Sequence, residues 1–154
     1  MATLYSNQKT KWSQNVPSEK IDTNEQGGRL RIAFADVTLA SAAIADVVQM
    51  VNLPNGARII DGYLTNAALG SSTTLSVGYA AYKNAAGTTV ALSAAAYFVA
   101  ASTATAARND IFATQALGAN SVVDANEDGL PISITLAGGT ASGVVQIAIR
   151  YVVD

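Results

Sequence analysis

Residues 47–64 read VVQMVNLPNGARIIDGYL and predict two strands joined by a tight turn. Val47–Leu53 is mostly apolar and β-branched, as is typical of a strand, and Ala57–Leu64 is apolar and extended again. Pro54 presets φ, and Asn55 or Gly56 adopts a positive φ at low cost. The segment carries no reactive group, so we interpret Pro54, Asn55 and Gly56 as a structural turn.

Composition favours one domain whose core is thin. Half of the 154 residues are apolar, but 30 of them are alanine and only ten residues are Phe, Tyr or Trp. Alanine buries little area, so a monomer gains less from its core than the apolar fraction suggests. We therefore expect part of the apolar surface to contact a partner.

Charge and residue types exclude several function classes. Nine Lys and Arg against eleven Asp and Glu leave a net charge of −2, which argues against nucleic-acid binding. The chain has no Cys and no His, which removes disulfides, thiol nucleophiles and imidazole bases. Ser–Lys catalysis through Lys83 or Lys20 has no supporting motif, so we expect no enzyme and no cofactor.

Residues 1–28 predict an extended arm. They hold six charged residues and few aliphatic ones, and they end in Gly27-Gly28. Tyr5, Trp12 and Val16 are spaced apolar anchors in this segment, next to Lys9 and Lys11. One interpretation is a frayed terminus. The favoured one is an arm that orders on a neighbouring subunit, because aromatic residues are enriched at interfaces.

Alternation with a period of two predicts strands in most of residues 29–154. Leu30, Ile32 and Phe34 alternate with smaller or charged residues, and the apolar parity changes at Asp36, which predicts a bulge or bend. Residues 130–136 and 145–153 alternate again around Gly138-Gly139, which predicts an antiparallel hairpin whose last strand lies inside a sheet.

Two alanine-rich segments are ambiguous. Ser93–Ala101 predicts a short helix or helical loop, because alanine favours helix and Ser93 can cap one. Asn84–Ala107 carries no charge, but its many Thr and Ser residues favour a soluble segment over a membrane span.

Together these patterns predict an all-β fold. We expect an antiparallel two-sheet sandwich, jelly-roll-like, over residues 29–154, with the extended N-terminal arm of residues 1–28 and at most one short helix.

An acidic segment resembles part of a calcium loop. Asp124, Asn126, Asp128 and Gly129 match the first half of an EF-hand, but Thr135 stands where the bidentate Glu is required. A weaker calcium site at Asp124, Asn126 and Asp128 stays an alternative to the favoured acidic turn.

Four tyrosines offer an alternative function. Tyr63, Tyr79, Tyr82 and Tyr97 are candidates for a sugar-binding platform, although such residues more often lie in cores or subunit interfaces.

The segments DVVQMVNLPNGA (46–57), RIIDGYL (58–64) and TLSVGY (74–79) resemble the decoration, or cement, proteins of tailed-bacteriophage capsids. The resemblance covers roughly residues 30–80, and its most specific part is Leu53–Ala57 followed by Ile59.

The resemblance implies a structural virion protein on the capsid exterior that bridges major capsid subunits and stabilises the shell. It also implies a homotrimer, but it matches no residue of this chain to a known capsid contact. From the spaced apolar anchors of the arm itself, we expect Tyr5, Lys9, Lys11, Trp12 and Val16 to contact the capsid or other subunits. We expect no nucleic-acid and no membrane partner. The alternative is a carbohydrate- or receptor-binding β-sandwich of a head fibre or tail.

Overall fold

The computed structural model describes residues 6, 9–11, 27–113 and 122–153, and for residues 98–102 only the backbone. Within these residues the chain forms ten strands and a single helical turn at residues 9–11. The strands are β1 Leu30–Ala42, β2 Val47–Leu53, β3 Arg58–Asn66, β4 Thr74–Tyr79, β5 Tyr82–Lys83, β6 Thr89–Val90, β7 Ser93–Ser102, β8 Ala107–Ile111, β9 Leu130–Ala137 and β10 Ala141–Val152.

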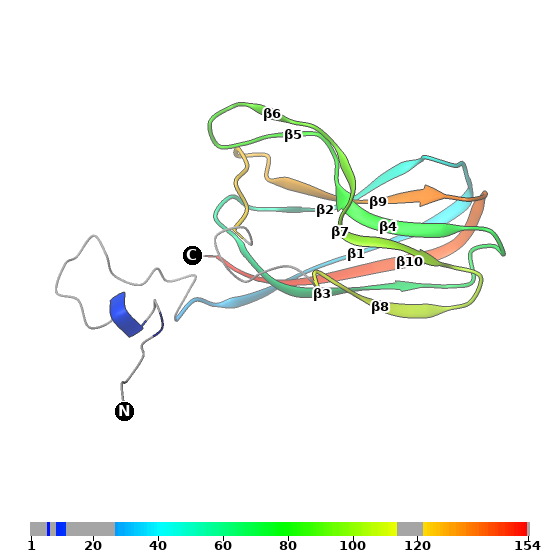
Figure 1. Cartoon of the computed structure of the whole chain (residues 1–154), viewed down its shortest axis with the longest axis horizontal. Helices are drawn as coiled ribbons and strands as arrows, with labels where there is room; N and C mark the ends of the chain where they lie inside the picture. The colour runs from blue at the N-terminus through cyan, green and yellow to red at the C-terminus, as the bar shows by residue number, and fades with distance from the viewer. Residues whose placement is uncertain (1–5, 7–8, 12–26, 114–121, 154) are drawn as a thin grey trace.

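Eight of the strands form two packed antiparallel sheets. Sheet A has the order β1-β10-β3-β8 and sheet B the order β2-β9-β4-β7, and the two lie as separate layers in Figure 1. The first strands of the chain pair with the last ones in reverse order: β1 with β10, β2 with β9, β3 with β8 and β4 with β7. The chain therefore folds as one long antiparallel hairpin whose successive pairs alternate between the two sheets. This is the strand order of a jelly roll, and it confirms the predicted all-β sandwich.

The predicted C-terminal hairpin is wrong in its pairing. Strands β9 and β10 occur where expected, but they lie in opposite sheets. The loop between them crosses the sandwich and packs tightly, since a Cβ added at Gly138 would lie 2.1 Å from the Ser72 carbonyl oxygen. Strand β10 does lie inside a sheet, paired with β1 on one side and β3 on the other, as predicted.

The turn at Pro54–Gly56 likewise joins the two sheets, because β2 belongs to sheet B and β3 to sheet A. Gly56 has φ 75°, while Asn55 keeps a negative φ. The turn is held from outside: the Gly56 N–H donates to the Val123 carbonyl at 2.9 Å, and Asn55 Oδ1 accepts from the Ala125 N–H at 3.3 Å.

The helix predicted at Ser93–Ala101 is wrong, since these residues belong to strand β7. Strand β7 pairs with β4 at the edge of sheet B. The helix propensity of alanine is a weak preference, and the unpaired edge of β4 offers hydrogen bonds that outweigh it.

The bulge predicted near Asp36 is also wrong. The register of β1 against β10 runs unbroken from Leu30 to Leu39 and shifts only after Leu39. The alternation of apolar residues along β1 changes phase at Asp36 for another reason. The first large apolar residues of β1 point outward, whereas Val37 and Leu39 point toward the core.

The core lies between the sheets and is filled by their inward rows. Its largest buried side chains come mainly from the central strands: Leu64, Leu75, Val77, Ile132, Ile134, Leu136, Ile147 and Ile149. Each contributes about 1.5–3 kcal/mol by leaving water.

The hairpin β5–β6 projects beyond the sandwich at the upper left of Figure 1 and pairs with no strand of either sheet. No helix in the described part of the chain is long and apolar enough to cross a membrane.

Candidate interaction surfaces

Three large apolar side chains stand exposed on the outer face of sheet A. Leu30, Ile32 and Phe34 are 57%, 64% and 58% exposed, which is unusual for such residues in a row. They occupy alternate positions of β1, so they point to the same side of the sheet, about 7 Å apart along the strand. We call these three residues the apolar stripe.

The stripe lies on an edge strand. Among the described residues, β1 pairs with β10 alone, so the other edge of its backbone has no strand beside it. A long exposed edge combined with apolar side chains is a surface that natural proteins usually cover with a partner.

Two arginines on the rest of this face contact other side chains of the chain. Arg150 forms a bidentate ion pair with Asp61, with Nε 2.5 Å from Oδ1. The hydrogen bond and charge of Asp61 raise the pKa of the Arg150 guanidinium. Arg108 lies 3.7 Å above the ring of Tyr63. These two arginines therefore already have partners, whereas Asp36, the next residue of β1 on the same side as the stripe, is exposed.

The outer face of sheet B is different in kind. Its row on β9 carries Ser133 and Thr135, and the neighbouring strands add Gln49 and Ser76. The hydroxyls of Ser133 and Thr135 are buried and have no hydrogen-bond partner in the described part of the chain. Gly78 lies against the start of β7, because a Cβ there would lie 1.7 Å from the Ser93 carbonyl oxygen.

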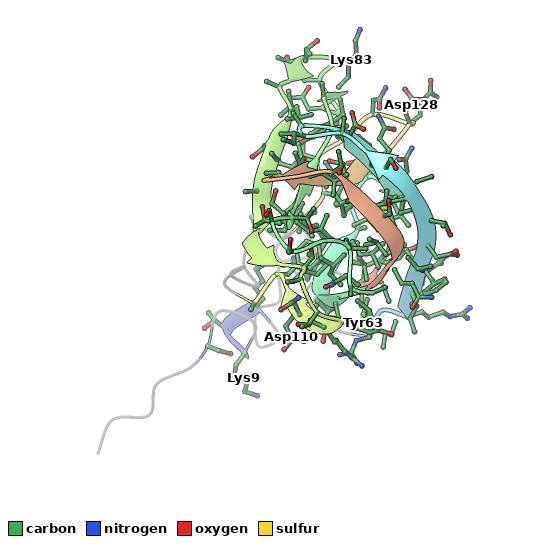
Figure 2. All side chains as sticks on the ribbon, turned by 90° about the vertical axis from the view of Figure 1, so that its right-hand side faces the viewer. Lys9, Tyr63, Lys83, Asp110 and Asp128 are labelled. Atoms are coloured by element: carbon green, nitrogen blue, oxygen red, sulfur yellow. The ribbon has the colours of Figure 1, made fainter. Side chains whose placement is uncertain are left out.

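A groove of about 390 Å³ opens at the end of sheet B, beside the β5–β6 hairpin. We call it the end groove. In Figure 2, Lys83 and Asp128 lie near one another at one end of the molecule, and Tyr63 and Asp110 lie at the opposite end. The groove is lined by Gln49, Asn52, Ala81, Tyr82, Lys83, Thr89, Asn126, Asp128, Gly129 and Pro131.

Each of the three calcium candidates makes a hydrogen bond within the chain, and the weak calcium site stays a prediction. Asp124 Oδ1 accepts from the Ala85 N–H at 3.1 Å, in the β5–β6 turn. Asn126 and Asp128 instead bond each other: Asn126 Nδ2 donates to Asp128 Oδ2 at 2.9 Å, and the Asp128 N–H donates to Asn126 Oδ1 at 3.1 Å. The described residues hold no group of three or more His, Cys, Asp or Glu side chains that could hold a metal ion; Asn126 is not one of these residue types.

The four candidate tyrosines do not form one platform. Tyr79 contacts Tyr82 edge-to-face at 5.5 Å and Tyr97 at 6.0 Å, while Tyr63 lies on sheet A. Tyr79, Tyr82 and Tyr97 pack against the core. Burial raises the pKa of Tyr97 well above its usual value, and Tyr82 and Tyr79 raise it further. Burial also raises the pKa of Tyr82, with added effects of Tyr79 and Asp124.

The arm residues are only partly described. Lys9 and Lys11 lie in the helical turn of residues 9–11, where the Lys9 N–H donates to Ser6 Oγ at 3.2 Å. Tyr5, Trp12 and Val16 lie outside the described residues, so their role as contacts stays a prediction.

Sequence reasoning missed the stripe and the end groove. The parity change at Asp36 signalled the stripe, because an unbroken strand with that pattern must show large apolar residues on both faces. The groove left no signal, since its lining comes from segments as far apart as residues 49 and 131.

No family model matches the chain, and no curated protein matches it either. Solved structures with the same fold come from phage capsids. A chain of the cyanophage Pam1 capsid asymmetric unit aligns with a TM-score of 0.58 at 20% identity, covering 92% of this chain and 99% of that one.

Two further capsid structures contain similar chains. A chain of the Ralstonia phage GP4 capsid has a TM-score of 0.60 at 19% identity, covering 82% of this chain and 86% of that one. A chain of the acid-stable capsid of Helicobacter pylori bacteriophage KHP30 has a TM-score of 0.52 at 14% identity, covering 80% and 87%. At these identities the likeness is one of fold: this chain has a fold similar to that of chains found in three phage capsids.

Proposed function

We propose that this protein is a structural component of a phage virion that binds the outside of the icosahedral capsid and stabilises it by bridging major capsid subunits. The observation that carries the proposal is the whole-chain likeness to a chain of the Pam1 capsid asymmetric unit. The alignment covers 92% of this chain and 99% of that one, so the likeness extends over nearly all of both sequences.

The apolar stripe supports an assembled rather than a solitary protein. Three exposed side chains on a free sheet edge lose contact with water when a neighbour covers them, at about 25 cal/mol for each Å² buried. We propose that copies of this chain meet at Leu30, Ile32 and Phe34 in a homotrimer. The centre of the stripe is uncharged, so identical copies meet there without repulsion between like charges.

The arm supplies the second proposed contact. In this proposal residues 1–28 leave the sandwich and lie on the capsid, with Tyr5, Trp12 and Val16 as apolar anchors and Lys9 and Lys11 as polar ones. The arm joins the sandwich directly before β1, which places its origin beside the stripe.

The alternative, a carbohydrate- or receptor-binding sandwich of a head fibre or tail, depended on exposed tyrosines. Tyr63 lies on sheet A, apart from the cluster of Tyr79, Tyr82 and Tyr97, so the four do not form the shared platform on which that alternative was based.

The test uses shells of the encoding phage assembled without this protein. We expect the purified protein to co-sediment with the shells at saturating stoichiometry and to raise their melting temperature. Binding to the assembled state alone stabilises it by about 2.7 kcal/mol at a free concentration of 100 times Kd. A chain lacking residues 1–20 serves as the comparison: it should keep the folded sandwich and bind more weakly. Shells that neither bind the intact protein nor melt higher would refute the proposal.

A further inference from the structure

The end groove is built from three segments that hydrogen bonds hold together. Asn52 Nδ2, on β2, donates to the Asp128 carbonyl at 3.1 Å. The Asn126 N–H donates to the Lys83 carbonyl, on β5, at 2.8 Å. These two bonds link the edge of sheet B, the projecting hairpin and the 126–129 turn, so the walls of the groove are positioned before any ligand arrives.

Several polar groups in the groove have no protein partner. The Gln49 amide, the Lys83 ammonium and the Tyr82 hydroxyl make no hydrogen bond in the described part of the chain, and Asp128 Oδ1 accepts none. Gln49 and Lys83 are exposed to solvent at the rim. The groove thus offers an amide, a cation, a hydroxyl and a carboxylate oxygen, which include both donors and acceptors.

The groove also has a fixed apolar side. The ring of Tyr82 stands edge-to-face with Tyr79 at an interplanar angle of 89°, which fixes its orientation. Ala81 and Pro131 extend this apolar surface. An aromatic face beside amide and carboxylate groups suits a ligand with C–H surfaces on one side and hydroxyls on the other.

Charge decides between classes of polar ligand. The groove holds one cation, Lys83, and one anion, Asp128, so its formal charge is zero. A phosphate or nucleotide site needs an excess of donors and positive charge, and a divalent cation needs converging carboxylates. Neither condition is met, and the balance favours a neutral polyhydroxylated molecule.

We propose that the end groove binds a short neutral saccharide, such as an oligosaccharide of hexose and N-acetylhexosamine units. Its volume lies at the lower end of the range of small-molecule sites, which suits a short ligand. In this arrangement the sugar ring stacks on Tyr82, and Gln49, Lys83 and Asp128 bond its hydroxyls. The site goes beyond the structural role and does not depend on it.

The test is an array of neutral and acidic oligosaccharides probed with the full chain, followed by calorimetric titration of the strongest neutral binder. We expect binding in the micromolar to millimolar range, as is typical of a shallow polar site. Gln49→Ala and Lys83→Ala should each weaken it at least tenfold, since both side chains are exposed and their removal leaves the fold intact.

Glu127→Ala is the matched control, because Glu127 is an exposed residue of the same turn that does not line the groove. It should bind like the parent protein. Tyr82→Phe keeps the ring and removes only the hydroxyl, so it should lose less affinity than Gln49→Ala.

Three results would overturn the proposal: no neutral binder on the array, a preference for acidic glycans, or neutral binding that Gln49→Ala and Lys83→Ala leave unchanged. Shell binding measured on the same variants distinguishes a failure of the saccharide proposal from a failure of the capsid proposal. Gln49→Ala should co-sediment with shells as the parent does, whether or not it binds sugar.

Discussion

The two sheets bury similar inner rows but present opposite outer faces. Sheet A exposes an apolar stripe on its edge strand β1, whereas the outer row of sheet B carries small polar side chains that are partly or fully buried, and a polar groove opens at its end. The inner rows are alike because both must fill one core. The outer rows do not have to fill a core, so the two sheets can differ there. We therefore assign the proposed contacts with other copies of the chain and with a saccharide to the outer rows.

The largest expected effect on stability comes from adding a side chain at Gly78, where the backbone of Ser93 lies against strand β4. Gly78→Ala places a methyl group against the backbone of Ser93, which cannot move without disturbing the pairing of β4 with β7. We expect a loss of about 3 kcal/mol or more in the free energy of unfolding, measured by urea denaturation.

Ser76→Ala is the control for that variant, since Ser76 occupies the same outward row of β4 and its hydroxyl makes only a long contact of 3.5 Å with the Thr135 carbonyl. It should change the unfolding free energy by less than about 1 kcal/mol. Equal stabilities for the two variants would show that the close approach at Gly78 is relieved at little cost.

The second effect tests the stripe directly. Ile32→Lys should weaken self-association by about tenfold to a hundredfold for each buried contact, as expected from 1.5–3 kcal/mol for one Ile side chain. Analytical ultracentrifugation measures it. The dissociated sandwich should stay folded, as circular dichroism can show, because the side chain is 64% exposed.

Val47→Lys makes the same kind of change on the edge strand of sheet B, where Val47 is 38% exposed. It should leave association unchanged. A parent protein that is a monomer at high concentration would remove the role of the stripe. A dimer that Ile32→Lys dissociates would keep the stripe and remove the trimer.

The third effect concerns alkaline pH and sheet B. Burial raises the pKa of Tyr97 in the folded state above the usual 10.0. As the pH rises, the Tyr97 hydroxyl therefore loses its proton in the unfolded chain before it does so in the folded protein. The contribution of protonated Tyr97 to the free energy of unfolding is complete below pH 10 and declines as the pH rises further. The decline is at most about 1.4 kcal/mol per pH unit for one proton. Tyr97→Phe should show a shallower loss of stability between pH 9 and 11 in denaturant titrations, and parallel curves would contradict the assignment.

The smallest effect is expected on the charged half of sheet A. Asp61→Asn removes the ion pair with Arg150, but both side chains are about half exposed, so water and salt screen their attraction. We expect no change in the thermal midpoint beyond the scatter of repeated scans. A clear loss of stability that high salt abolishes would show that the pair matters more than its exposure suggests.

Much of the fold was predictable because strands leave a local signature. Alternation located β1, β4, β9 and β10, and Pro54–Gly56 marked a turn at the correct position. The helix predicted at Ser93–Ala101 failed because the helix preference of alanine is weak and local, whereas the pairing of this segment with β4 is non-local and outweighs it.

By itself the sequence determined that the chain is a β-sandwich, where its turns fall, and that thiol and imidazole chemistry are absent. Only the tertiary structure decided that β9 and β10 face each other across the core, that Leu30, Ile32 and Phe34 point outward, and that Gln49, Lys83 and Asp128 meet in one groove. The physical reason is range. A period of two depends on neighbours in the chain. The pairing of strands depends on residues as far as 122 positions apart, such as Leu30 and Val152, which come together only when the core closes.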